Sequence, residues 1–198
     1  MRLGILGGTF DPPHNAHMLI ARAARVQLDL DRVLFAPAGI QPLKKDRRST
    51  PADQRAEMVA LAIEHEPRFE LSRIDLDRPG PHYTIDLLEI ASRQYPGAQW
   101  WFIMGSDSLG DLLRWRDPQR LIRMTRLAVL RRSGFQPDWQ MLEAELPDLR
   151  ARIDWIDAAP IDVSAHEIRR RVRAGESIEG LTPPAVAEYI EENRLYGE

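Results

Sequence analysis

Short apolar runs of strand length alternate along the chain with longer segments that repeat apolar residues at helical spacing. The candidate strands cover residues 3–6, 33–35, 69–74, 100–104, 127–130 and 153–156. This alternation is typical of a parallel sheet whose crossover connections are helices. The pattern therefore predicts an α/β fold: a Rossmann-like, doubly wound parallel sheet of five or six strands with helices on both faces.

Several helices have readable first residues. They begin near Thr50-Pro51, with proline at the first helical position, near Thr84, near Asp117-Pro118 and at Thr182-Pro183. Ser164 and Glu167 have the spacing of a capping box, and Gly175 should stop the helix that follows. Because no repeat, low-complexity tract or long linker divides the chain, we expect residues 1–198 to form a single domain.

Composition excludes several classes of function. Lys and Arg total 27 against 30 Asp and Glu, so a net charge of -3 gives no general attraction to nucleic acid or to an anionic membrane. The absence of cysteine removes disulfides, thiolate metal sites and cysteine nucleophiles, and favours a reducing, cytoplasmic compartment. The apolar stretch at the N-terminus is interrupted by glycines too early for a signal peptide or a membrane span.

The first candidate strand runs into GGTFDPPHNAH, residues 7–17, and a helical pattern follows. Glycines allow close approach of a ligand, and a helix start offers N–H groups and a positive dipole end to a phosphate. His14 and His17 are three residues apart, so both can face one anion. Taken singly, the glycine turn is common in α/β folds and the histidine pair is equally compatible with an exposed helix start.

Together these residues resemble the GxFDPxHxGH signature of the HxGH nucleotidyltransferase superfamily, with Ala16 in place of the usual glycine. Members of that superfamily transfer a nucleotidyl group from a nucleoside triphosphate to a phosphate acceptor. The resemblance implies that His14 and His17 are catalytic and contact the α-phosphoryl oxygens. The same resemblance assigns ATP binding to three residues of the turn, namely Gly8, Thr9 and Phe10.

A second resemblance lies near the C-terminus, where VSAHEIR, residues 163–169, is similar to the superfamily motif ISSTxIR. It implies that Ser164 and Arg169 bind the β- and γ-phosphates of ATP at a helix start. His166 departs from the usual Ser or Thr, which puts a hydroxyl contact there in doubt. The alternative is a capped surface helix with a solvated basic face, which we prefer for the three arginines that follow Arg169.

The middle of the chain resembles the bacterial nicotinate mononucleotide adenylyltransferases. Its segments HYT at 82–84, GSDS at 105–108 and WR at 115–116 are similar to that family's SYT, GxDS and W-Y/R motifs, in the same order. The resemblance implies that Trp115 stacks on the pyridine ring and that the N–H groups of Thr84 and Arg116 receive the nicotinate carboxylate. It also places Asp107 against ribose hydroxyls of ATP, although helix capping is an equal alternative for this aspartate.

Two further cations are candidates for binding the acceptor phosphate. Lys44 lies in QPLK, similar to the family's PPHK, within a basic loop at residues 38–49 that follows a strand. A lysine there can reach a phosphate as a point charge, but solvated loop charge is a serious alternative. Arg132, after the strand at 127–130, is a weaker candidate of the same kind.

The resemblance as a whole implies transfer of the adenylyl group of ATP to nicotinate mononucleotide, giving nicotinate adenine dinucleotide and pyrophosphate. Mg²⁺ should arrive with ATP, because no carboxylate cluster suggests a dedicated metal site. The substrates are then the expected partners, and the oligomeric state stays open. Phosphopantetheine adenylyltransferase is the nearest alternative enzyme, and a non-catalytic nucleotide sensor is an alternative of another class, supported by Ala16 and His166.

Overall fold

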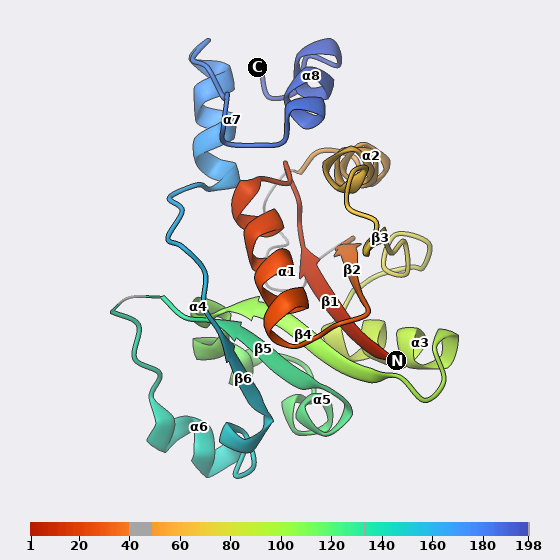
Figure 1. Ribbon diagram of the computed structural model, residues 1–198, viewed down its shortest axis with the longest axis vertical. Helices are drawn as coiled ribbons and strands as arrows, with labels where there is room; N and C mark the ends of the chain where they lie inside the picture. Colours follow the sequence, from red (N-terminus) through yellow and green to blue (C-terminus); the bar gives the residue numbers. More distant parts are fainter. Residues whose placement is uncertain (40–48, 133, 198) are drawn as a thin grey trace.

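The computed structural model describes residues 1–39, 49–132 and 134–197. Six parallel strands form one sheet in the order β3-β2-β1-β4-β5-β6, which confirms the predicted α/β fold (Figure 1). The strands are β1 (Arg2–Gly8), β2 (Arg32–Pro37), β3 (Phe69–Leu71), β4 (Gln99–Gly105), β5 (Arg126–Leu130) and β6 (Ile153–Ile156). The strand expected at 69–74 ends early because the carbonyl of Arg73 accepts the N–H groups of Leu76 and Asp77 and turns the chain.

Helices connect the strands and cover both faces of the sheet (Figure 1). They are α1 (Asn15–Gln27), α2 (Ala52–Ile63), α3 (Thr84–Gln94), α4 (Ser106–Gly110), α5 (Pro118–Met124), α6 (Trp139–Glu145), α7 (Ala165–Arg173) and α8 (Pro184–Glu192). Two single-turn 3₁₀ segments, Leu112–Arg114 and Arg150–Arg152, complete the set in the described ranges. None of the described helices is long and apolar enough to cross a membrane.

Successive side chains of the central strands point to opposite faces and build two cores. In β4, Trp100 and Phe102 pack with the apolar residues of α3 and α5, whereas Trp101 and Ile103 pack with those of α1 and α2. Both faces are therefore apolar, as a parallel sheet with helices on each side requires.

Of the predicted helix starts, those at Thr84 and Asp117-Pro118 are confirmed, while those at Pro51 and at Thr182-Pro183 need correction. The helix expected at Thr182-Pro183 begins at Pro184, because Pro183 is its N-cap in extended backbone. Asp117 caps α5 by accepting the N–H of Arg120, and α3 begins at Thr84 as expected. Pro51 does not occupy the first helical position of α2 but is its N-cap, with ψ at 143°, in extended backbone. A residue whose ψ is extended cannot itself be helical, so the helix begins at Ala52.

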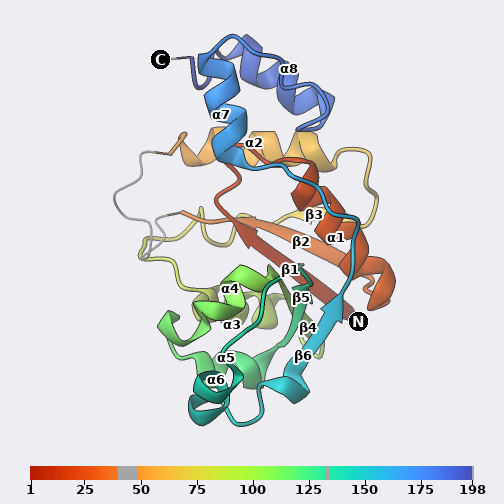
Figure 2. The same ribbon diagram turned by 90° about the vertical axis from the view of Figure 1, so that its left-hand side faces the viewer.

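The order of the strands places a topological switch point between β1 and β4. β1 continues through α1 on one face of the sheet and β4 through α5 on the other, so the loops at their carboxyl ends diverge. In this class of fold, ligands bind beside such a point. Helices α7 and α8 stand beyond this edge, reached from β6 by a long connection (Figure 2). The C-terminal segment thus lies over the motif that begins the chain.

The opposite edge of the sheet is held by Asp154 of β6. Its carboxylate accepts hydrogen bonds from Nε and Nη2 of Arg126 (2.5 and 2.8 Å) and from Nε1 of Trp101 (2.7 Å). Burial opposes its ionisation, but these hydrogen bonds and the charge of Arg126 outweigh burial, so the pKa of Asp154 is lowered. One carboxylate therefore joins three neighbouring strands far from the switch point.

We predict that Asp154→Asn lowers the free energy of unfolding by about 1–3 kcal/mol, because the donors of Arg126 and Trp101 lose a charged acceptor. Since the folded pKa of Asp154 lies below its unfolded value, this stabilisation is present above the unfolded pKa and is lost as the pH falls through the folded pKa. Urea denaturation of both proteins at pH 7 and at a series of decreasing pH values measures the difference in the free energy of unfolding. If the two proteins differ in free energy of unfolding by the same amount at every pH, the role of the carboxylate charge is contradicted.

Candidate functional site

Gly7 and Gly8 are the last residues of β1, so the turn predicted at these glycines begins only after them, and the ring of Phe10 packs against Gly8. A Cβ on Gly8 would lie 3.1 Å from the ring of Phe10, which is 1% exposed and has a positive φ of 51°. The same ring meets the ring of His17 edge to face, with centroids 4.8 Å apart. The side chain of Phe10 therefore packs against the turn and against His17. Because this side chain is buried, only the backbone of Phe10 could contact a nucleotide.

His14 is the N-cap of α1 and His17 lies in its first turn. Their rings stack with centroids 3.7 Å apart and planes inclined by 26°. The N–H of His14 donates to Nδ1 of His17 (3.2 Å), so in neutral His17 the ring proton is on Nε2. The two rings therefore lie side by side, as their spacing predicts, and Nε2 carries the N–H of the neutral His17 ring.

His14 differs from His17 in burial and in hydrogen bonding. It is 8% exposed, and its Nδ1 is a buried atom with no hydrogen-bond partner among the described residues. Burial lowers the pKa of His14 to about 4, so the ring is neutral at neutral pH in the free protein. Because buried polar atoms are nearly always hydrogen-bonded, the unpaired Nδ1 indicates a place for a ligand atom or water.

The N–H groups of α1 are less available than the sequence suggested. The N–H of Asn15 donates to the carbonyl of Leu181 (3.0 Å), and those of His17 and Met18 donate to the carbonyl of His14 (2.8 and 3.4 Å). An anion at this helix start would therefore interact mainly with the two imidazoles and with the positive end of the helix dipole. Few backbone N–H groups there are free to bind it.

Arg55 of α2 is a structural residue of the site that the sequence analysis did not identify. It is 2% exposed, its Nε donates to the carbonyl of Thr50 (2.9 Å), and its Nη1 donates to the carbonyls of Thr9 (2.6 Å) and Ala38 (2.8 Å). Burial lowers the pKa of Arg55, while the charge of Asp11 opposes this shift. The only sequence signal was an arginine among the apolar positions of a predicted helix, next to Ala56.

Helix α7 reaches the same turn from the other end of the chain. Nη1 of Arg169 donates to the carbonyl of Asp11 (2.5 Å), which brings this predicted ATP-binding residue against the N-terminal motif. Oγ of Ser164 accepts the N–H of Glu167 and caps the helix. No described residue accepts a hydrogen bond from the N–H of Ala165 or His166, so this helix start keeps donors for an anion.

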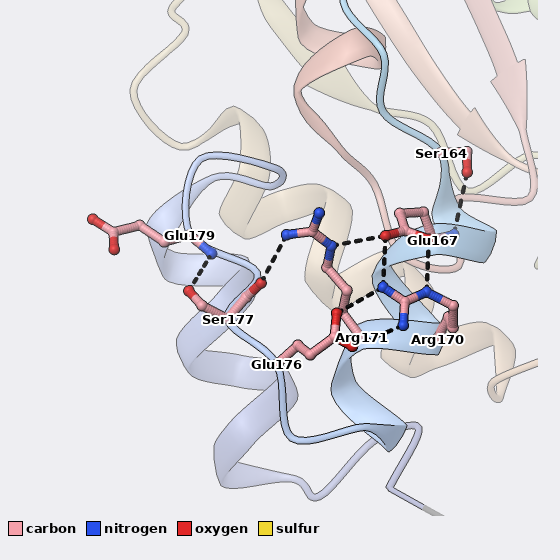
Figure 3. A network of polar contacts seen from close by, with 7 residues as sticks. All are labelled: Ser164, Glu167, Arg170, Arg171, Glu176, Ser177 and Glu179. Carbon is pink, nitrogen blue, oxygen red and sulfur yellow. Dashed lines mark hydrogen bonds and ion pairs between the residues drawn. The ribbon is translucent and has the colours of Figure 1, made fainter.

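The basic face of α7 is neutralised by carboxylates, as Figure 3 shows. Glu167 accepts from Arg170 and Arg171, and Glu176 accepts from Arg170. These hydrogen bonds lower the pKa of Glu167 to about 2. The capping box is thus only half formed, because the carboxylate of Glu167 binds arginines and does not return to the N–H of Ser164.

The predicted nicotinate residues lie on the other side of the switch point. The ring of Trp115 meets the ring of Phe102 in β4 edge to face, with centroids 5.5 Å apart, and the indole is only partly buried. The guanidinium of Arg116 lies 4.6 Å from the ring centroid of Tyr83, the residue before Thr84. The structure therefore brings Trp115, Arg116 and the start of α3 together, and no described residue accepts the N–H of Thr84 or Arg116.

Asp107 and Arg132 form an ion pair with each other. Their side chains are 63% and 67% exposed, so the pair contributes little stability and opens easily. The structure thus pairs Arg132 with a predicted ATP-binding residue. Lys44 falls outside the described residues, and no described group of three His, Asp or Glu side chains could hold a metal ion.

Known proteins share the sequence of this chain over nearly its whole length. Residues 5–171 match the family described as Cytidylyltransferase-like. A protein of Herpetosiphon aurantiacus named probable nicotinate-nucleotide adenylyltransferase is 45% identical over 98% of this chain and 98% of its own. A protein of Thermus thermophilus with the same name is 41% identical over 99% of this chain and 100% of its own.

A solved structure shares the fold at lower identity. The nicotinic acid mononucleotide adenylyltransferase of Plasmodium falciparum, complexed with NaAD, superposes with a TM-score of 0.78 at 21% identity, over 98% of this chain and 97% of its own. The identity with the curated relatives extends over nearly the whole of both chains. This chain belongs to the nicotinate-nucleotide adenylyltransferase family, within the cytidylyltransferase-like proteins.

Proposed function

We propose that this protein transfers the adenylyl group of ATP to nicotinate mononucleotide, releasing pyrophosphate and nicotinate adenine dinucleotide. The observation that carries the proposal is the stacked pair of His14 and His17 at the start of α1, with the buried Nδ1 of His14 unpaired among the described residues. The names of the curated relatives support the same substrate. The absence of cysteine is consistent with the cytoplasm as the proposed compartment.

The reaction needs alignment more than an activated side chain, because the acceptor phosphate is already a nucleophile. One of its oxygens attacks the α-phosphorus in line, and the bond from that phosphorus to the bridging oxygen breaks. Pyrophosphate leaves with the electron pair. In our assignment, Nε2–H of His17 donates to an α-phosphoryl oxygen, where charge accumulates, and His14 donates from its ring to a neighbouring oxygen.

The triphosphate extends from the histidines toward α7 in this proposal. Arg169 is already at the motif, and the helix start at Ser164 offers two N–H donors to the β- and γ-phosphates. A divalent cation, Mg²⁺ in our proposal, neutralises the phosphates of bound ATP. The described residues offer it no three-ligand cluster, so phosphate oxygens and water would be its main ligands.

The acceptor lies across the switch point. Trp115 presents an indole face to the pyridine ring, and the N–H groups of Thr84 and Arg116 bind the nicotinate carboxylate. An amide would turn its own NH₂ donor toward these N–H groups, which cannot pair with it. Opening of the pair formed by Asp107 and Arg132 frees the aspartate for a ribose hydroxyl and the arginine for the acceptor phosphate.

We predict that pyrophosphate release with ATP and Mg²⁺ is fastest with nicotinate mononucleotide. Against nicotinamide mononucleotide, kcat/KM should be roughly 10- to 100-fold higher, since the amide leaves donors unpaired. Parallel assays with both mononucleotides and with phosphopantetheine at equal concentrations measure the preference. A preference for the amide would overturn the carboxylate site, and turnover with phosphopantetheine alone would overturn the acceptor. Absence of turnover with all three would favour a nucleotide sensor.

We predict that a bound triphosphate raises the pKa of His14. In the free protein that pKa is about 4, against an ordinary value of 6.5, so the buried neutral ring makes stability rise with pH between these two values. Phosphate oxygens stabilise the imidazolium and should reverse the shift. NMR titration of the histidine rings with and without a non-hydrolysable ATP analogue measures it, with exposed His65 as internal control. An unchanged titration of His14 in the complex would place the phosphates elsewhere.

We predict that Trp115→Ala raises KM for nicotinate mononucleotide by roughly tenfold, because stacking on the indole is lost. KM for ATP should stay within about twofold, since the nucleotide lies on the other side of the switch point. Trp139→Ala is the matched control, as Trp139 is also half-buried but packs against Trp155. Equal effects of Trp115→Ala on both substrates would argue that the indole only supports β4.

A further inference from the structure

The carboxylate of Asp11 joins segments from both ends of the chain. Asp11 lies three residues before His14 and is 7% exposed. Its Oδ1 accepts the hydroxyl of Tyr196 (2.7 Å), and its Oδ2 accepts the N–H of Thr50 (3.3 Å). Its backbone carbonyl accepts Arg169 (2.5 Å), so a single residue links the motif, the start of α2, α7 and the C-terminal turn.

Other contacts fix the C-terminal segment on the same motif. Oγ1 of Thr182 donates to the carbonyl of Pro13 (2.7 Å), and Nδ2 of Asn15 donates to the carbonyl of Gly180 (2.8 Å). Helix α8 follows and buries Val186 and Ile190 in the core beside α2. Tyr196 therefore approaches Asp11 from a segment that is already anchored at two earlier points.

The hydroxyl of Tyr196 stays protonated and can therefore donate its hydrogen bond to Asp11. Burial raises the pKa of Tyr196, and the neighbouring charge of Asp11 raises it further, so the phenol stays protonated. A neutral hydroxyl that donates to a carboxylate forms a stronger hydrogen bond than two neutral groups do. The bond fixes the orientation of the Asp11 carboxylate inside the turn.

We infer that Tyr196 is a positioning residue for adenylyl transfer, which acts through Asp11 on the orientation of the His14 and His17 rings. The inference rests on the proposed function of these histidines. The turn from Asp11 to His14 is short, and His14 in turn donates its N–H to Nδ1 of His17, so a shift at Asp11 is passed to both rings. Displacement of a phosphate-binding ring by a fraction of an ångström is costly for an in-line transfer.

The test is Tyr196→Phe, which removes the hydroxyl and keeps the ring. We expect kcat to fall about tenfold with KM for nicotinate mononucleotide unchanged, because the acceptor site is untouched. Rates are normalised to the folded fraction measured by thermal unfolding. Tyr189→Phe is the matched control, since Tyr189 is half-buried in the same segment and none of the hydrogen bonds recorded among the described residues joins its hydroxyl to the motif. An undiminished kcat in Tyr196→Phe would overturn the inference.

A readout independent of turnover separates positioning from a general loss of stability. Histidine-ring NMR signals of Tyr196→Phe should shift for His14 and His17 and stay in place for His65, whereas Tyr189→Phe should leave all three unchanged. Unmoved signals of His14 and His17 in a folded Tyr196→Phe would overturn the inference. Because the spectra need no substrate, they remain decisive even if the wild-type protein fails to turn over nicotinate mononucleotide.

A double-mutant cycle with Asp11→Asn tests the route. If Tyr196 acts through the Asp11 carboxylate, the double variant should lose no more kcat than the more impaired single variant. Multiplicative losses would show that the two residues act independently and would overturn the route. Should Tyr196→Phe fold poorly, unmoved ring signals of His14 and His17 in Asp11→Asn would overturn the inference, since the hydrogen bond from Tyr196 is weakened there while the phenol ring stays packed.

Discussion

A buried guanidinium needs acceptors for its N–H groups, and in this protein that need organises the edge of the sheet where the chemistry takes place. Arg55 finds its acceptors in the carbonyls of Thr9, Ala38 and Thr50, which belong to the loops after β1 and β2 and to the start of α2. If one of these carbonyls moved away, an N–H group of a guanidinium that is only 2% exposed would lose its acceptor, which costs free energy. The hydrogen bonds of Arg55 therefore fix the positions of the loops after β1 and β2.

The turn that binds Arg55 is also bound by the C-terminal segment of the chain. Asp11, Pro13 and Asn15 each bond to a residue of the C-terminal third, namely Tyr196, Thr182 and Gly180. Contacts between residues so far apart in sequence require the whole sheet to be in place, so the site depends on the tertiary structure of the entire chain. Helix α8 contributes the apolar surface that makes this closure favourable.

Electrostatics divide the site into parts with different charge. His14 is kept neutral by burial, which lowers its pKa to about 4, so it can respond to an arriving anion. Most of the basic face of α7 is already paired with Glu167 and Glu176, while Arg169 points to the motif. Of the four arginines of this helix, Arg169 is the one that donates to the N-terminal motif.

Sequence alone determined the fold class, the helix starts at Asp117 and Ser164, and the pairing of His14 with His17, because these follow from periodicity, capping and i, i+3 spacing, which are local. The motif matches also indicated the chemistry. Local patterns do not contain the burial of Arg55 or the bond from Tyr196 to Asp11, since each joins segments that are distant along the chain. Those contacts, and the pairing of Asp107 with Arg132, were decided only by the tertiary structure, which sets what each polar group finds beside it once water is removed.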